Sequence, residues 1–261
     1  MSTAEGARTF RVAGDAYDRF MGRYSRPLAR LFADAADVRP GQRALDVGCG
    51  PGALTSELVA RLGADAVASV DPSEPFVTAC AERHPGVDVR VGRSEELPYA
   101  DASFDRVLCQ LVLRFVSDAP RAVAEQRRVG RPGGLVGACV WDSTSGMEML
   151  DAFWQAARVV SSSATSDDLL LGGPGEIVAL LEAAGLEDVV ESELRVESTY
   201  TDFDELWDAF LLGVGPAGSL ALGLDDERRE RLRQELLLRI GSPVGSFTLR
   251  GMARCAVGRV H

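Results

Sequence analysis

The 261-residue sequence predicts an α/β fold in which helices cover both faces of a mostly parallel sheet. From Arg43 to Trp141, short apolar runs alternate with amphipathic segments of helical period. The first apolar run leads directly into a glycine-rich turn that opens a helix. With 46% hydrophobic residues, one continuous core is expected, and therefore a single domain over residues 1–261.

The alternating unit, residues 42–141, contains five expected strands and three expected helices. The strands are Ala44–Gly48, Ala66–Asp71, Val87–Val91, Phe104–Leu108 and Leu135–Trp141, and the helices are Ala53–Leu62, Pro75–Arg83 and Ala119–Val129. The tetrapeptide Arg131-Pro132-Gly133-Gly134 is expected to end the third helix in a turn. Strands joined through helices in this way run parallel.

The flanking segments extend the unit on both sides. Residues 10–36 carry apolar residues at helical spacing and predict one or two helices, with Pro27 as a break. After Trp141 we expect a serine-rich loop at 161–166 and two further strands, Asp188–Val196 and Phe247–Val260. Helices are expected at Gly175–Ala184, Asp202–Leu212 and Asp225–Ile240, with a loop at Gly213–Gly218. The segments 142–175 and 200–245 are thus placed to cap a pocket.

Composition excludes several classes of function. A net charge of −11 without a basic run argues against nucleic acid and anionic membranes as partners. No apolar stretch approaches the roughly 20 residues of a membrane span, so a cytoplasmic protein is expected. The sequence has no lysine and only two histidines, which excludes Schiff-base and P-loop chemistry and argues against a catalytic triad or a metal site. The five cysteines are widely spaced and predict reduced packing residues.

The turn after the first strand contains the most informative residues. Gly48 and Gly50 allow a tight bend and let a ligand lie against bare main chain. Their spacing also fits a dinucleotide fingerprint. Asp46 separates these possibilities, because a carboxylate at this strand end repels a diphosphate and suits a ligand with an ammonium group. Asp71, at the end of the next strand, is expected to accept hydrogen bonds from a ribose diol, although it could also serve the start of the following helix.

The stretch from Ala44 to Trp141 resembles the class I S-adenosylmethionine (SAM)-dependent methyltransferases, in particular a small-molecule branch similar to the quinone-biosynthesis enzymes. Five segments carry the resemblance in order: residues 45–52, Val70-Asp71-Pro72-Ser73, residues 94–98, Ser103-Phe104-Asp105 and residues 131–134. The resemblance implies a Rossmann-like sheet of seven strands with the last strand antiparallel. It also implies SAM as cofactor, bound across the carboxyl ends of the first, second and fourth strands.

The resemblance also implies roles for individual residues. Gly48 and Gly50 would back the methionine part of SAM, and Asp46 would receive its ammonium group. Asp71 would hold the ribose, while Pro72, Ser94 and Glu95 would surround the adenine, and Gln110 and Leu111 would line the methionine end.

The segment from Tyr17 to Ser25 is similar to a lid helix of that branch, in which a tyrosine closes over the cofactor and an arginine meets its carboxylate. Tyr17, Arg23 and Tyr24 are the candidates. An amphipathic helix packed on the sheet is the alternative interpretation.

Two residues depart from the branch pattern. Arg93 stands where many relatives carry an acidic residue that reads the adenine amino group, and Arg114 replaces a frequent histidine. Arg114 is too basic to act as a proton acceptor, so it is expected either to bind an anionic substrate group or to form a surface ion pair. The sequence nominates no general base.

The late segments are expected to hold the methyl acceptor, a small molecule. Their aromatic residues could floor its pocket together with the Gly213–Gly218 loop, or could simply pack in the core: Trp141, Phe153, Trp154, Trp207 and Phe210. The function predicted is transfer of a methyl group to O, N or C of that molecule, mainly by proximity and exclusion of water. The alternatives are a nicotinamide-dependent oxidoreductase and a non-catalytic nucleoside-binding module. The oligomeric state cannot be derived from the sequence.

Overall fold

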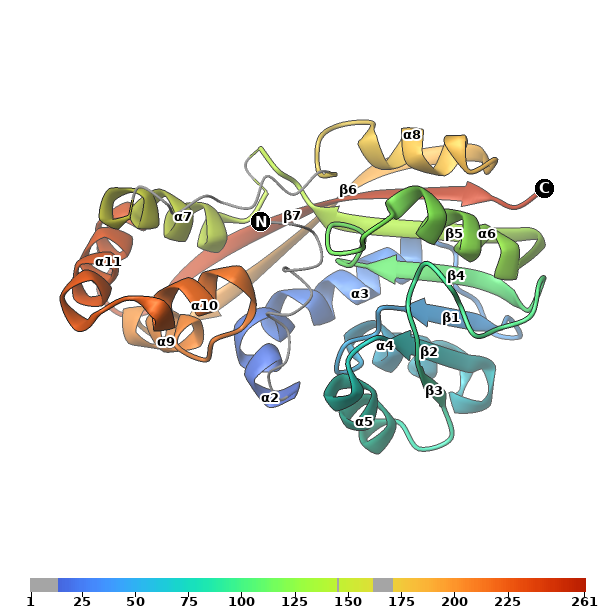
Figure 1. Ribbon diagram of the computed structural model, residues 1–261, viewed down its shortest axis with the longest axis horizontal. Coiled ribbons are helices and arrows are strands. Elements are labelled where there is room, and N and C mark those ends of the chain that lie inside the picture. Colours follow the sequence, from blue (N-terminus) through green and yellow to red (C-terminus); the bar gives the residue numbers. More distant parts are fainter. Residues whose placement is uncertain (1–13, 145, 162–170) are drawn as a thin grey trace.

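A seven-stranded sheet forms the centre of the computed structural model, which describes residues 14–144, 146–161 and 171–261 (Figure 1). The strand order is β3-β2-β1-β4-β5-β7-β6. The strands are β1 (Ala44–Val47), β2 (Val67–Asp71), β3 (Asp88–Val91), β4 (Phe104–Gln110), β5 (Gly130–Trp141), β6 (Glu187–Tyr200) and β7 (Phe247–Arg259). Only β7 pairs antiparallel with its neighbours, β5 and β6, so the sheet predicted from the sequence is confirmed.

Helices cover both faces of the sheet. Helices α3 (Arg23–Ala35) and α4 (Ala53–Leu62) pack on one face, and α6 (Ala119–Val129) and α8 (Glu176–Ala183) on the other. Helix α5 (Glu74–Arg83) packs against β2 and β3. Because successive strand residues point to opposite faces, Leu45 and Val47 join the core under α6, while Asp46 between them points toward α4. All five cysteines are buried free thiols, as expected of packing residues.

The N-terminal segment differs from the expectation at Pro27. Helix α2 (Gly14–Tyr17) continues into a π-helical turn, η2 (Asp18–Gly22), and then into α3, which contains Pro27 in its interior. The predicted break at Pro27 is therefore wrong. Proline stands near the start of α3, where its missing N–H removes a single hydrogen bond, and the irregularity of the segment lies instead in the wider π turn before it.

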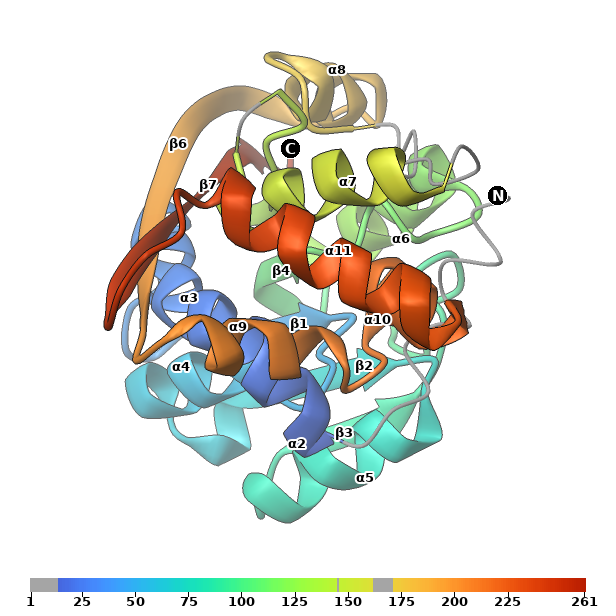
Figure 2. The same ribbon diagram turned by 90° about the vertical axis from the view of Figure 1, so that its left-hand side faces the viewer.

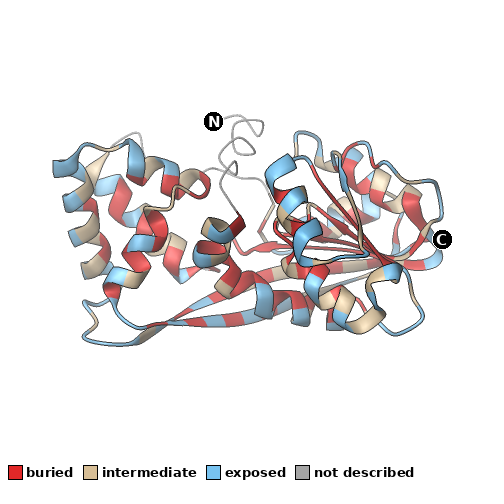
Figure 3. Ribbon diagram, turned by 90° about the horizontal axis from the view of Figure 1, so that it is seen from below, coloured by how far each residue is buried: buried red, intermediate tan, exposed pale blue. Residues whose placement is uncertain are grey.

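A helical cap stands at the far end of the β6–β7 ribbon (Figures 1 and 2). It consists of α7 (Glu148–Val160), α9 (Phe203–Phe210), α10 (Gly215–Gly223) and α11 (Asp226–Arg239). The segment from Phe247 to Met252 pairs with β6 beyond the last residue of β5, so the ribbon reaches past the rest of the sheet. Figure 3 shows buried residues both in the sheet and on the inner faces of the cap helices.

Two predicted loops are parts of regular elements. The Gly213–Gly218 segment becomes helical from Gly215, because Pro216 at the first helical positions has its backbone preset for a helix and needs no N–H partner there. Residues 131–134 form the irregular start of β5, beside a register shift in β4. Of the predicted serine-rich loop, residues 162–166 lie outside the described residues.

Among the described residues, no individual helix combines the length and apolar composition of a membrane span. Only α9 and α10 taken together reach that composition, and they meet at an angle of 90°.

Candidate functional site

The glycine turn after β1 lies against the end of β2. The backbone N–H groups of Gly48 and Cys49 both donate to the carbonyl of Val70, at 2.8 and 3.0 Å. Gly48, Gly50 and Gly52 all have positive φ, at 76°, 51° and 99°. A Cβ atom on Gly48 would lie 2.3 Å from Val112, whereas one on Gly50 would meet no atom within 4 Å. Packing therefore requires glycine at position 48, while Gly50 leaves its main chain open to a ligand.

Asp46 is a buried carboxylate at the base of this turn. Its exposed fraction is 1%, and it accepts a hydrogen bond of 2.7 Å from the hydroxyl of Thr55 on α4. That hydroxyl lies 2.9 Å from the hydroxyl of Ser69 on β2. Burial raises the pKa of Asp46 to about 7, against the opposing effect of the Thr55 hydrogen bond. A cationic group beside Asp46 would favour the ionised form and lower this pKa.

Asp71 is the second buried carboxylate and lies at the carboxyl end of β2. Its two oxygens accept hydrogen bonds from the backbone N–H groups of Gly50, at 2.9 Å, and Ser73, at 2.8 Å. Burial raises its pKa to about 6. Asp71 thus joins the glycine turn to the start of α5, and each oxygen keeps a lone pair that can accept from a hydroxyl group.

Several buried polar atoms around the strand ends have no hydrogen-bond partner within the described part of the chain. They are the hydroxyl oxygens of Ser25, Ser73 and Ser94 and the amide oxygen of Gln110. The amide nitrogen of Gln110 donates to the carbonyl of Ser25 at 3.0 Å. Buried polar groups without partners are rare in folded proteins. Ser94 and Gln110 occupy two of the positions that the family resemblance assigns to SAM, so the residues present fit that cofactor.

Glu95, expected at the adenine edge, is held by the loop that follows β4. It accepts hydrogen bonds from the backbone N–H and the hydroxyl of Ser117, at 2.9 and 2.6 Å, and lies 3.5 Å from Arg93. Although burial acts to raise it, the pKa of Glu95 is lowered by these hydrogen bonds and by the charge of Arg93. Pro72 is exposed next to Asp71. The roles of Glu95 and Pro72 toward adenine remain predictions.

Of the three predicted lid residues, Tyr17 lies at the cofactor turn. Its ring packs edge-on against Phe76 of α5, with the ring centroids 5.7 Å apart. Burial, followed by the charges of Asp71, Asp18 and Asp46, raises the pKa of its hydroxyl. Tyr17 also lines a cavity on its other side, so it stands between the glycine turn and that cavity.

The other two lid candidates point toward the cap. Arg23 forms an ion pair with Glu205 at 2.6 Å, and its guanidinium lies 3.9 Å from the centre of the Tyr200 ring. The hydroxyl of Tyr24 lies 3.2 Å from that of Tyr200 in the buried core. The structure thus separates Arg23 and Tyr24 from the group around Asp46, and their predicted contacts with the cofactor stay untested.

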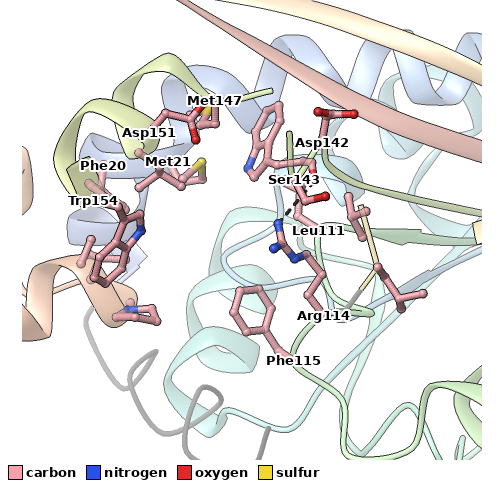
Figure 4. A pocket seen from close by; sticks show the side chains of 18 of the residues that line it. Phe20, Met21, Leu111, Arg114, Phe115, Asp142, Ser143, Met147, Asp151 and Trp154 are labelled. Atoms are coloured by element: carbon pink, nitrogen blue, oxygen red, sulfur yellow. Dashed lines mark hydrogen bonds between the residues drawn. The ribbon is translucent and has the colours of Figure 1, made fainter. Parts of the chain in front are cut away.

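The cavity beside Tyr17 has a volume of about 690 Å³ and lies between the strand ends and the cap (Figure 4). Its apolar walls include Phe20, Met21, Phe115, Trp141, Met147 and Trp154. Leu111, which follows Gln110 at the end of β4, lines it with a φ of 61°, a strained conformation for a leucine. Of the aromatic residues expected around the acceptor, only Trp141 and Trp154 line the cavity.

The remaining aromatic candidates belong to the core of the cap. Phe153 and Phe210 stack with their ring centroids 4.3 Å apart, and Trp207 is buried nearby. Val214, Gly215, Pro216 and Ala217 do line the cavity, as part of the first turn of α10 and the residue before it. Arg114 also faces the cavity and donates to the carbonyl of Trp141 at 3.3 Å.

Sequence reasoning missed Phe20, Met21, Met147 and Asp151. Phe20 and Met21 lie within the Tyr17–Ser25 segment, whose similarity to a lid helix was the available signal, whereas Met147 and Asp151 belong to no local motif and line the cavity through the packing of α7.

Comparisons with known proteins agree with this geometry. A family model described as a methyltransferase domain matches residues 45–137. Nocamycin O-methyltransferase of Saccharothrix syringae is 32% identical over 212 residues, a match that covers 72% of this chain and 75% of the relative. Demethylmenaquinone methyltransferase of Renibacterium salmoninarum is 42% identical over 110 residues, which are 42% of this chain and 46% of the relative. In that comparison the match spans about half of the relative's length.

A solved structure with the same fold is phosphoethanolamine N-methyltransferase 2 of Haemonchus contortus, in complex with phosphomonomethylethanolamine and S-adenosylhomocysteine. It is 17% identical, has a TM-score of 0.59, and the match covers 95% of this chain and 57% of that chain. At this identity the likeness concerns the fold alone. The nocamycin enzyme, at 32% identity over 75% of its length, establishes the family of this chain. The chain therefore belongs to the SAM-dependent methyltransferases, and its cofactor is SAM.

Proposed function

We propose that this chain transfers a methyl group from SAM to an O, N or C atom of a small molecule held in the 690 Å³ cavity. One observation carries the proposal. Tyr17 lines the cavity and is also within electrostatic reach of Asp46 and Asp71 at the cofactor turn. The two binding regions therefore meet at Tyr17, and an acceptor in the cavity can approach a cofactor lying on the glycine turn.

Different residues around the turn would contact different parts of the cofactor. Gly48 and Gly50 would back its methionine part, with Asp46 and the open amide oxygen of Gln110 toward the ammonium group. Asp71 would accept from the ribose hydroxyls, and the buried hydroxyl of Ser94 would lie at the adenine edge with Glu95 and Pro72 beside it. Leu111 would separate the methionine end from the acceptor.

When bound, SAM supplies a methyl group on a sulfonium, a good leaving group. The protein has then to align the acceptor atom with that methyl group and keep water out. The apolar walls formed by Phe20, Met21 and Trp154 suit both tasks. The cavity volume lies within the roughly 300–1,000 Å³ typical of small-molecule sites.

The walls of the cavity favour an acceptor that has an apolar body and a polar group. Aromatic rings and methionine side chains such as Phe20, Met21 and Trp154 line it together with charged residues such as Arg114 and Asp151. The names of the two relatives refer to nocamycin and demethylmenaquinone. We propose an aromatic or isoprenoid-like molecule of comparable chemistry, and regard nucleic acid as unsuited to a protein with a net charge of −11.

The proposal is tested by cofactor binding and by product formation. Calorimetry should show SAM binding in the absence of NADH binding, and mass spectrometry should detect S-adenosylhomocysteine when the protein is incubated with SAM and a panel of small phenols, amines and quinones. Preferential binding of NADH would overturn the proposal. SAM binding without product across the panel would favour the remaining alternative, a nucleoside-binding module without catalysis.

A further inference from the structure

Among the residues that the structure describes, three carboxylates line the proposed acceptor cavity, and two of them have structural partners. Asp142, which follows β5, accepts from the guanidinium of Arg254 at 2.5 Å and from the backbone N–H of Thr144 at 2.9 Å. Glu176, at the start of α8, accepts from the backbone N–H groups of Gly172 and Gly173, both at 2.8 Å. These two side chains therefore hold loops and strands in place.

The third carboxylate, Asp151, is in a different situation. It lies in the first turn of α7 and is half-buried, and Figure 4 shows its side chain beside Met147 and Met21 in the cavity wall. Its carboxylate accepts a hydrogen bond from the backbone of Met147. Across residues 14–144, 146–161 and 171–261, no arginine lies within ion-pair distance of it, in contrast to Asp142.

The surroundings of Asp151 make it a stronger base than an ordinary aspartate. Burial, followed by the charges of Asp142 and Glu148, raises its pKa, against the opposing effects of the Met147 hydrogen bond and the charge of Arg158. The other described titratable groups that line the cavity are Tyr17 of the N-terminal helix, Arg114 of the loop after β4, Asp142 after β5, Arg158 of α7 and Glu176 of α8. A base is most effective when its pKa approaches the working pH.

We propose that Asp151 is the proton acceptor for the methyl transfer. This inference rests on the proposed function and narrows it to acceptors that carry a hydroxyl or a neutral amino group. In the step, a lone pair on the acceptor O or N forms a bond to the methyl carbon, the carbon–sulfur bond breaks, and its electron pair passes to sulfur, which becomes a neutral thioether. The proton released by the acceptor goes to a carboxylate oxygen of Asp151.

Asp151→Asn removes the basic oxygen at nearly constant volume, and Asp208→Asn is the matched control, because Asp208 is exposed on α9 and borders a separate groove. On weakly acidic phenols we expect Asp151→Asn to lower kcat/KM by about 10²–10³-fold, the usual contribution of a general base. On nitrophenols that are already ionised at the assay pH the loss should be less than about fivefold, because no proton remains to be taken. SAM affinity should match that of the wild type, and Asp208→Asn should keep full activity on all acceptors.

The pH profile gives a second criterion. Wild-type kcat/KM on a weakly acidic phenol should rise with pH through an apparent pKa above the ordinary aspartate range, and this acidic limb should vanish in Asp151→Asn. Should Asp151→Asn be poorly folded, Asp151→Ala is the second variant, and its activity should recover when formate supplies a carboxylate. Equal losses on ionised and un-ionised phenols, or an unchanged acidic limb, would overturn the inference while leaving the methyltransferase function intact.

If the wild type methylates none of the phenols, that result counts against the proposed function. A fluorescence titration then still tests the inference about Asp151. Trp154 lies three residues after Asp151 and lines the same cavity. Its fluorescence should then titrate with an apparent pKa above the ordinary aspartate range in the wild type and in Asp208→Asn, but not in Asp151→Asn. Titration of the wild type in the ordinary range would contradict an activated Asp151.

Discussion

At the scale of single residues, the site depends on two carboxylates that the fold buries before any ligand binds. Asp46 and Asp71 end adjacent parallel strands and are 1% and 7% exposed. Burial raises both pKa values, so the protein without cofactor holds acids that ionise reluctantly. A ligand that brings a positive charge to Asp46 relieves this cost, and a diphosphate would increase it.

Asp46→Asn should become more stable relative to the wild type as the pH rises. The folded-state pKa of Asp46, about 7, lies above its ordinary value of 3.8. The protonated carboxyl therefore contributes folding stability that is fully present below pH 3.8 and is lost as the pH rises through 7. At about 1.4 kcal/mol for each pKa unit, the pH-dependent part of the difference in free energy of unfolding amounts to about 4 kcal/mol in all, of which about 3 kcal/mol should appear between pH 5 and pH 8. Urea unfolding of both proteins at pH 5 and pH 8, without SAM, measures it. Parallel pH dependences would contradict the buried state of Asp46.

Asp71→Ala should weaken SAM binding by about 1–3 kcal/mol, the scale of hydrogen bonds to a charged group. The loss has two sources, since Asp71 would accept from the ribose and already positions the N–H groups of Gly50 and Ser73. Calorimetry measures the affinity, and circular dichroism serves as the control for folding. Wild-type affinity in a folded variant would refute the assignment of Asp71 to the ribose.

Alanine at Gly48 should mainly affect folding stability, and alanine at Gly50 should mainly affect SAM binding. Both positions have positive φ, which costs an L-residue about 1–2 kcal/mol. Gly48→Ala adds a clash with Val112 worth about 1–3 kcal/mol and should mainly lower stability, whereas Gly50→Ala meets open space and should mainly weaken SAM binding. Thermal unfolding and calorimetry separate the two effects, and Val112→Ala should restore part of the stability of Gly48→Ala. Equal effects of both variants on SAM affinity would argue against a ligand over Gly50.

Asp46, Gly48, Gly50 and Asp71 could be predicted from the sequence, because each is recognised from the residues next to it along the chain. A strand end, a glycine and a carboxylate within a few positions are a local pattern, and Asp46 lies only nine residues from its partner Thr55. The partners of Arg23 could not be derived in this way, because Glu205 is 182 residues distant. Asp151 was missed for the same reason, since its environment arises only when α7, packed against α11 and β7, faces the residues that follow β4 and β5 across the cavity.

At the scale of elements, the N-terminal helix joins the sheet to the cap. Arg23 and Tyr24, at the start of α3, contact Glu205 of α9 and Tyr200 at the end of β6. The same chain, a turn and a half earlier, places Tyr17 over the cofactor turn. The helical segment that carries Tyr17 therefore also carries the residues that contact the cap.

Arg23→Met should lower stability without weakening SAM binding. It removes a partly exposed ion pair and a contact with the Tyr200 ring, which together contribute about 1–2 kcal/mol. Chemical unfolding measures the stability, and the SAM dissociation constant should change by less than about twofold, since uncoupled sites contribute independently. A tenfold weaker affinity for SAM would instead support the role toward the cofactor carboxylate that the family resemblance implies.

Most elements followed from periodicity, and the errors have local causes. The seven strands were expected at nearly the observed positions, because apolar runs bounded by turn residues are a strong signal. The predicted break at Pro27 and the predicted loop at Gly213–Gly218 were wrong. Proline and glycine usually interrupt helices, but the sequence does not show where each helix starts. Pro216 lies at the start of α10, where the missing N–H is tolerated, whereas Pro27 is accommodated inside α3, after the π-helical turn.

At the scale of the whole molecule, the glycine turn and the 690 Å³ cavity lie along the carboxyl ends of the strands, where we propose that cofactor and acceptor bind. The core of the sheet and the core of the cap are joined through α3 and through β6 and β7. A ligand bound at this junction contacts residues from many elements, so it should stabilise the fold as a unit.

SAM at 100 times its dissociation constant should stabilise the folded protein by about 2.7 kcal/mol. For a chain of this size, that gain should raise Tm by about 5 °C or more. Differential scanning calorimetry with increasing SAM measures the shift, and NADH at the same concentration is the control. A shift with NADH alone would contradict the assignment of the cofactor.

The long β6–β7 ribbon has a consequence for how acceptor choice can change. Helices α9, α10 and α11 all lie between Tyr200 and Phe247, so they leave the sheet and return to it through two paired strands. The segment is an insertion that is connected along the chain to the rest of the sheet through the paired strands β6 and β7. Exchanging it would change the wall that Val214 and Pro216 give to the proposed acceptor cavity, while the carboxylates and glycines proposed to hold the nucleoside, all before position 112, would keep their places.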